Sequence, residues 1–156
     1  MKINLIAVGK NMPEWVEDGY CEYAKRLPSN LTLQLLEIAM PKRNKNEDPG
    51  RVVEQEGERM LAAISHDSLV IALDEHGKTW RTLDLAKQLQ SWQENYTSVS
   101  LLVGGPDGLS LACKKRANFT WSLSSLTLPH PLVRVVVAEQ IYRAWSILQK
   151  HPYHRE

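Results

Sequence analysis

Cysteines and long apolar runs are scarce in this chain. Its 156 residues include only two cysteines, Cys21 and Cys113, which form no CxxC pair. A disulfide framework is therefore excluded, and a reducing compartment is expected. No apolar run approaches the ~20 residues that span a bilayer, and the apolar stretch at the start is short for a signal peptide. We therefore expect a cytoplasmic protein with no membrane partner.

An excess of positive charge is also missing. The chain has 19 Lys and Arg against 18 Asp and Glu, a formal net charge of +1. This balance alone favours an enzyme for small molecules, because a protein that holds nucleic acid by charge alone is usually far more basic. We expect no DNA partner, and an RNA substrate would need a folded target or a local basic surface. Candidates for that surface, which could equally be a solvated face, are Lys42, Arg43, Lys45, Lys114, Lys115 and Arg116.

Strand and helix patterns alternate along the whole sequence. Short apolar runs predict strands near 3–8, 31–38, 69–73, 99–103 and 119–123. Helical spacing of apolar residues predicts helices near 13–27, 53–64, 85–92, 110–116 and 132–150. This order predicts an α/β fold, in which a mainly parallel sheet has helices on both faces. Because no repeat or linker interrupts the pattern, residues 1–156 are expected to form a single domain.

The last predicted helix is apolar around most of its circumference. Its polar residues fall in one narrow polar strip, formed by Glu139, Arg143, Ser146 and Lys150. A helix that covers one sheet needs an apolar stripe of little more than about 100°, and this arc is far wider. A partner subunit in a two-fold homodimer would bury the second face. Burial within one domain is the alternative.

Three loops follow predicted strands, at the edge where parallel α/β sheets bind ligands. They are DEHGK after Leu73, GGPDG after Val103 and SSLTLPHP after Leu123. Gly104 and Gly105 would let the backbone approach a ligand closely, although a tight turn fits GGPDG equally well. The motif is not GxGxxG and the P-loop lysine is missing, so phosphate binding is not supported.

The SSLTLPHP loop is unusually apolar for a surface segment. Leu123, Leu126 and Leu128 would line a pocket, while backbone N–H and C=O groups could bind the edge of a flat heterocycle such as adenine. Pro129 and Pro131 would stiffen the loop, since proline restricts its own φ and its neighbour. A buried connection with a satisfied backbone is the alternative.

Three segments carry a family resemblance: LLVGGPDGLS, WSLSSLTLPHPLVRVVVAEQIYRAWSI and the terminal HPYHRE. They closely resemble the RlmH family of ribosomal RNA methyltransferases, within the SPOUT class, and the MPEWVEDGYCEY segment and the chain length match too. The resemblance implies a C-terminal trefoil knot and a homodimer in which the tail of one subunit helps complete the other's site. It also implies S-adenosylmethionine as methyl donor, and as substrate N3 of a pseudouridine in large-subunit (23S) ribosomal RNA on the assembled ribosome.

The resemblance assigns roles by position. The implied donor site comprises Leu73, Gly104, Gly105, Leu123, Ser124, Ser125, Leu126, Thr127 and Leu128. Pseudouridine N3 must lose a proton to become nucleophilic, and His130 or His154 could act as the base. Arg155 or Arg134 could stabilise the imide anion, and Tyr153 could stack on the target base.

Structural interpretations stay open for the same residues. His130 could cap the last helix, Arg134 could be a paired buried arginine, and the tail could be frayed. His151 and His154 have i, i+3 spacing but no third ligand, so no metal is expected. Residues more typical of packing than of RNA binding are Trp15, Trp80, Trp92, Trp121 and Trp145. Two other functions also stay open: a SPOUT enzyme that methylates tRNA, and a non-catalytic nucleotide-binding or ribosome-associated module.

Overall fold

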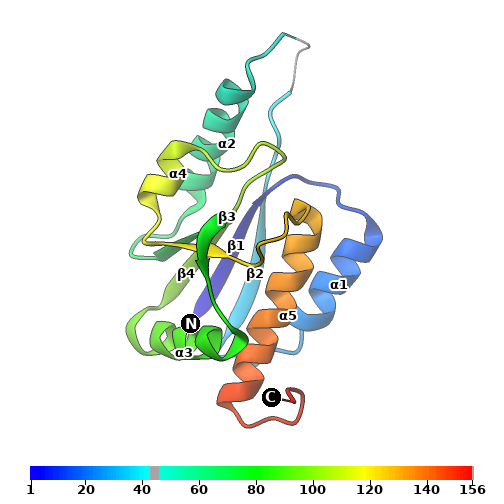
Figure 1. Cartoon of the computed structure of the whole chain (residues 1–156), viewed down its shortest axis with the longest axis vertical. Coiled ribbons are helices and arrows are strands. Elements are labelled where there is room, and N and C mark those ends of the chain that lie inside the picture. Colours follow the sequence, from blue (N-terminus) through cyan, green and yellow to red (C-terminus); the bar gives the residue numbers. More distant parts are fainter. Residues whose placement is uncertain (43–45, 156) are drawn as a thin grey trace.

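A computed structural model describes residues 1–42 and 46–155 (Figure 1). Its sheet has five parallel strands in the order β2-β1-β4-β3-β5. The strands are β1 (Lys2–Val8), β2 (Thr32–Ile38), β3 (Leu69–Thr79), β4 (Ser98–Val103) and β5 (Phe119–Ser122). The helices are α1 (Glu14–Ala24), α2 (Pro49–Ala63), α3 (Thr82–Asn95), α4 (Leu111–Arg116) and α5 (His130–Leu148).

Helices cover both faces of the sheet, as the sequence predicts. Alternate residues of β1 point to opposite faces, so Ile3 and Leu5 join one buried cluster while Ile6 and Val8 join another. The first cluster includes side chains of α1, α3 and α5, and the second includes side chains of α2 and α4. The α/β fold with a parallel sheet is therefore confirmed, while the trefoil knot stays a prediction.

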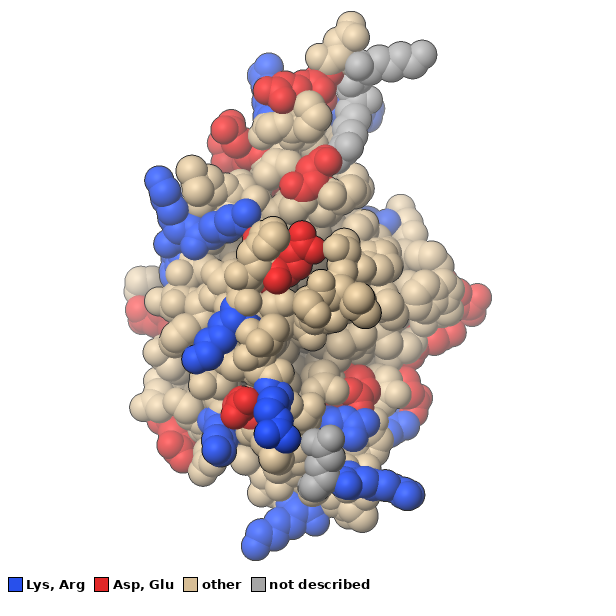
Figure 2. All heavy atoms as spheres, viewed as in Figure 1, with Lys and Arg blue, Asp and Glu red and all other residues tan. Residues whose placement is uncertain are grey.

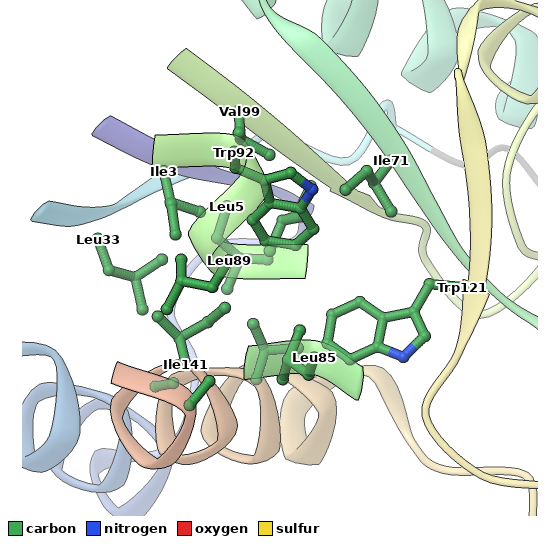
Figure 3. Close-up of a cluster of buried hydrophobic side chains, with 14 of the residues drawn as sticks. Ile3, Leu5, Leu33, Ile71, Leu85, Leu89, Trp92, Val99, Trp121 and Ile141 are labelled. Carbon is green, nitrogen blue, oxygen red and sulfur yellow. The ribbon is translucent and has the colours of Figure 1, made fainter. Parts of the chain in front are cut away.

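The larger core lies between the sheet, α3 and α5 (Figure 3). Leu85, Leu89 and Trp92, the predicted apolar face of α3, are all fully buried. Ile141 of α5 enters the same cluster. This packing fixes α5 across the sheet, so that its first residues lie at the carboxyl ends of the strands. Within the described part of the chain, every helix is too short or too polar to cross a membrane.

Strand β3 is longer than the sequence predicts and contains a bulge. Both Leu73 and Lys78 pair with Trp121 of β5, so residues 74–77 arch out of the strand. The bulge ends at Gly77, where a Cβ would lie 2.7 Å from the Thr120 carbonyl. The irregular pairing therefore places the DEHG segment at the carboxyl edge of the sheet, although β3 itself continues to Thr79.

Much of the wide apolar arc of α5 is used within the chain. Val137, Ala138 and Ile141 face the sheet core, and Val135 packs against Gly19 of α1, where a Cβ would lie 3.1 Å from it. Trp145 is partly buried against the same core. The width of the arc therefore does not by itself require a second chain.

Candidate functional site

A cleft of about 670 Å³ opens at the carboxyl ends of β3, β4 and β5. It falls in the size range of small-molecule sites, about 300–1,000 Å³. Three loops line it, namely the β3 bulge, the GGPDG turn and the segment after β5, and the first turn of α5 closes one side. Of the predicted donor residues the cleft brings together Leu73, Gly104, Gly105, Leu123, Ser124, Leu126, Thr127 and Leu128. Ser125 is exposed and lies outside the lining.

GGPDG is a tight turn that also forms one wall of the cleft. The Gly108 amide donates to the Gly105 carbonyl at 3.0 Å, and Gly108 has a φ of +82°. A Cβ on Gly104 would lie 2.5 Å from the Gly108 carbonyl carbon, and one on Gly105 would lie 3.2 Å from buried Glu56. These glycines are therefore required by packing within the protein, a role that the sequence left as an alternative.

The segment after β5 is held by its own side chains and by the β3 bulge. Ser122 Oγ donates to the Ser124 carbonyl at 2.9 Å, and Ser124 Oγ accepts from the Leu126 amide at 2.9 Å. At the cleft, Thr127 Oγ1 also donates to Glu75 Oε2 at 2.8 Å. The apolar loop is therefore connected to an acidic residue that faces it from a different strand.

Sequence reasoning missed the acidic rim of this cleft. Asp74, Glu75 and Asp107 line it, and Asp74 pairs with Lys114 of α4 at 3.3 Å. Hydrogen bonding from the His76 amide, and then from Lys114, lowers the pKa of Asp74. The signal that could have found Asp74 and Glu75 is their place directly after the predicted strand 69–73, and Asp107 is part of the GGPDG loop.

His130 lines the cleft as the first residue of α5. The N-cap is Pro129 and no side chain caps this end, so His130 is not a capping residue. Its Nδ1 is buried and has no hydrogen-bond partner among residues 1–42 and 46–155. Burial, and then the positive charge of Arg134, lower the pKa of His130 below 6.5. The imidazole is therefore mainly neutral at pH 7 and can accept a proton.

Arg134 is a buried structural residue. Its guanidinium pairs with Glu37 Oε2 at 2.8 Å and donates to the carbonyls of Val8 at 3.3 Å and Gly9 at 2.8 Å. The side chain is 2% exposed, and it ties α5 to the ends of β1 and β2. The alternative role, stabilisation of an imide anion, does not fit a group that is already paired and covered.

We expect Arg134→Met to lower the free energy of unfolding by about 3 kcal/mol, since removing one partner of a buried ion pair is strongly destabilising. The change also leaves the Val8 and Gly9 carbonyls without their donor. Urea denaturation measures the loss, with exposed Arg116→Met as control. A loss equal to that of the control would contradict this assignment.

The tail is folded against α5 and does not enter the cleft. Tyr153 OH donates to Glu139 at 2.9 Å, and His154 Nδ1 lies 3.2 Å from Ser146 Oγ. Glu139 lies nine positions after His130, which corresponds to about 14 Å of rise along an α-helix. Tyr153, His154 and Arg155 are absent from the cleft lining. The chain therefore does not bring its own tail and His130 together.

Four of the five tryptophans predicted to pack do so in the structure. Trp92 and Trp121 are buried, while Trp80 and Trp145 stack on Trp121 and Tyr142 at 5.1 and 5.8 Å. Trp15 is 58% exposed, so the packing interpretation is wrong for it.

The predicted basic surface is partly described. Figure 2 shows basic side chains over α4, the position of Lys114, Lys115 and Arg116. Lys42 is exposed, whereas Arg43 and Lys45 lie outside the described residues. No cluster of three or more His, Cys, Asp or Glu suited to a metal occurs in the described part of the chain.

Comparison with known proteins decides the family. A family model described as "Predicted SPOUT methyltransferase" matches residues 1–154. The chain belongs to the SPOUT methyltransferase family. Among its similar relatives, the ribosomal RNA large subunit methyltransferase H of Hahella chejuensis is 59% identical over 156 residues and that of Thioalkalivibrio sulfidiphilus is 56% identical, each over 100% of both chains. The RlmH resemblance is therefore confirmed.

Solved structures of two distantly similar methylase family proteins agree with the fold. A probable methylase family protein from Haemophilus influenzae has a TM-score of 0.54 at 13% identity, covering 99% of this chain and 70% of that chain. A methylase family protein from Neisseria gonorrhoeae has a TM-score of 0.51 at 16% identity, covering 99% of this chain and 86% of that chain. At such identities the likeness shows the fold alone.

Proposed function

We propose that this SPOUT methyltransferase transfers a methyl group from S-adenosylmethionine to N3 of a pseudouridine in 23S ribosomal RNA, on the assembled ribosome. The observation that carries the proposal is the cleft at the ends of β3, β4 and β5, which gathers nearly all of the residues predicted to hold the donor. Relatives that match the whole chain are named ribosomal RNA large subunit methyltransferase H. A ribosomal substrate also implies a cytoplasmic protein, and one family model over residues 1–154 favours a single domain.

The cleft suits S-adenosylmethionine in shape and charge. Leu73, Leu123 and Leu128 provide apolar walls for an adenine ring. Three carboxylates, from Asp74, Glu75 and Asp107, also line the cleft. They would favour the sulfonium and ammonium charges of the donor, since opposite charges attract strongly in a partly enclosed site.

Thr127→Val tests the link between the donor loop and Glu75. We expect donor affinity to fall by about 3- to 10-fold, because the segment after β5 loses the bond that holds it against the β3 bulge, and pre-organisation contributes to affinity. Calorimetric titration with S-adenosylmethionine measures the change. Ser125→Ala, in the same loop but outside the cleft, is the matched control. Equal donor affinities for both variants and the wild type would show that the bond between Thr127 and Glu75 does not contribute to donor binding.

His130 would take the N3 proton. S-adenosylmethionine supplies an activated methyl group, so the protein's task is to align the reactants and to prepare the nucleophile. A neutral imidazole in the cleft can accept the proton as N3 forms its bond to the methyl carbon. His130 then carries the proton, and S-adenosylhomocysteine leaves.

This assignment fixes the direction of the pH dependence. Because burial lowers the pKa of His130 from its usual value, we expect kcat/KM to be nearly constant from pH 7 to 8 and to fall at lower pH, where the imidazole becomes protonated. His130→Gln should lower kcat/KM by about 100-fold, and its rate should rise with pH, since N3 must then ionise unaided. Single-turnover rates across the pH range measure both. Parallel profiles for wild type and variant would exclude His130 as the base.

A second copy of the chain would supply the tail. Tyr153 and His154 contact α5, and neither they nor Arg155 line their own cleft, so a tail that acts at the donor must come from a partner. We therefore propose a two-fold homodimer in which each cleft receives the partner's tail. Basic residues of α4 at the edge of the cleft would contact the phosphates of the RNA.

Labelled methyl transfer separates the candidate functions. With S-adenosylmethionine labelled in its methyl group, we expect label in assembled ribosomes and little in free ribosomal RNA or tRNA. Label in tRNA alone would favour the other SPOUT activity. Absence of donor binding in a calorimeter would favour a non-catalytic module.

A further inference from the structure

The polar strip of α5 is occupied by the chain's own tail. The strip interrupts a helix that is otherwise almost entirely apolar, and three of its residues, Glu139, Arg143 and Ser146, face Tyr153 and His154. A tail that only frayed into solvent would leave these polar groups without such contacts. The strip therefore has a function that neither the sheet core nor the donor cleft explains.

Glu139 is the centre of these contacts. Its Oε1 accepts from Tyr153 OH at 2.9 Å and from Arg143 Nε at 2.8 Å, and its Oε2 accepts from Gln140 Nε2 at 2.7 Å. Gln140 is oriented in turn by Thr82 of α3, which donates to its oxygen at 2.9 Å. The glutamate side chain is only 18% exposed. A carboxylate held by donors from several directions is a rigid acceptor for the tyrosine hydroxyl.

The ring of Tyr153 is partly buried against neighbouring side chains. It meets Tyr142 edge-on at 4.6 Å, and the guanidinium groups of Arg143 and Arg26 lie 5.0 and 6.0 Å from its centre. Burial, and then the hydrogen bond to Glu139, raise the pKa of Tyr153 to about 12, so the hydroxyl stays a donor at neutral pH. These contacts with its own subunit favour an anchoring role for Tyr153 over stacking on an RNA base.

The ring of His154 is oriented by Ser146. Ser146 Oγ donates its single proton to the Arg143 carbonyl at 2.7 Å, so its oxygen accepts from Nδ1 of His154. In the neutral ring with this tautomer, Nε2 is the nitrogen left to contact RNA. Arg155, the next residue, is exposed.

We propose that Glu139 is a positioning residue that locks Tyr153 as the anchor of the tail, so that Nε2 of His154 and the guanidinium of Arg155 are presented to the RNA. This inference rests on the proposed function, in which the tail completes a methyl-transfer site. It assigns Tyr153 to anchoring and gives RNA contact to the two residues that follow it.

The test compares Glu139→Ala, Tyr153→Phe and the double variant with wild type. We expect each single change to lower kcat for methylation of ribosomes by about 10- to 30-fold, as expected when a reacting group is misplaced, with donor affinity unchanged. The double variant should be no slower than either single one, because both remove the same contact. Glu139→Gln, which keeps an oxygen toward Tyr153, should restore most of kcat. The control is Glu94→Ala, an exposed helical glutamate of α3.

A second measurement does not depend on activity. Carboxypeptidase digestion followed by mass spectrometry should remove Tyr153 faster from Glu139→Ala than from wild type or Glu94→Ala. Equal protection in all three, wild-type kcat in Tyr153→Phe, or additive losses in the double variant would overturn the proposal. If the wild type transfers no methyl to ribosomes, the proposed function fails, and tail protection still decides whether Glu139 holds Tyr153.

Discussion

Removal of Tyr153 to Glu156 is expected to lower methyl transfer to ribosomes by at least about 100-fold, the order of loss that misplaced or missing reacting groups cause, while donor affinity changes by less than about twofold. The reason is geometric. The tail lies along α5 and contributes nothing to its own cleft, so its loss spares the donor site. The deletion removes only the side chains that would contact RNA at the partner's cleft. Calorimetry and labelled methyl transfer measure the two effects separately.

Mixing two inactive variants is the control for this deletion. A chain with His130→Gln keeps its tail, and a chain without the tail keeps its cleft. In a mixed dimer one complete site forms from the cleft of one chain and the tail of the other, so activity should return to about a quarter of the wild-type level, from the statistics of two-fold pairing. Equal loss of donor binding and transfer in the truncated chain, or no recovery on mixing, would show that the tail is structural.

Gly104→Ala is expected to have the second largest effect. A Cβ there would lie 2.5 Å from the Gly108 carbonyl carbon and 2.6 Å from its oxygen, both of them backbone atoms. The turn must open, and we expect donor affinity to fall about 100-fold, because a shift of about 1 Å in a binding wall is costly. The free energy of unfolding should fall by about 1–3 kcal/mol, as for other overpacked sites.

Gly50→Ala is the matched control for that substitution. Gly50 lies in the first turn of α2, where a Cβ would make ordinary contact with the Asp48 side chain. We expect wild-type donor affinity for this variant. Calorimetry with S-adenosylmethionine compares the two, and unchanged affinity in Gly104→Ala would mean that the GGPDG turn is not part of the donor site.

Regular periodicity made most of the fold predictable. The buried face of α3, formed by Leu85, Leu89 and Trp92, follows directly from helical spacing, and the strands of the sheet follow from short apolar runs. The β3 bulge did not follow. The sequence predicted a loop for the residues after Leu73, because nothing in DEHGK indicates that Lys78 pairs with Trp121, the residue that also pairs with Leu73. The segment was placed at the ligand-binding edge of the sheet, but its acidic side chains were not assigned to the site.

The apolar lining of the candidate site could be predicted from the sequence. Leu123, Leu126 and Leu128 were recognised because apolar residues in a loop are unusual, and all three line the cleft. Contacts between distant side chains were not predictable. Neither the pairing of Arg134 with Glu37 nor the bond from Tyr153 to Glu139 has a local sequence signal, since each depends on how α5 lies across the sheet and how the tail turns back along it.

Mass spectrometry of 23S ribosomal RNA from cells that lack this protein tests the central claim most directly. The account predicts that one methyl group disappears from one pseudouridine and that it returns when the wild-type chain is supplied, but not when the Gly104→Ala chain is supplied. An unchanged set of methylated pseudouridines in the deficient cells would contradict it.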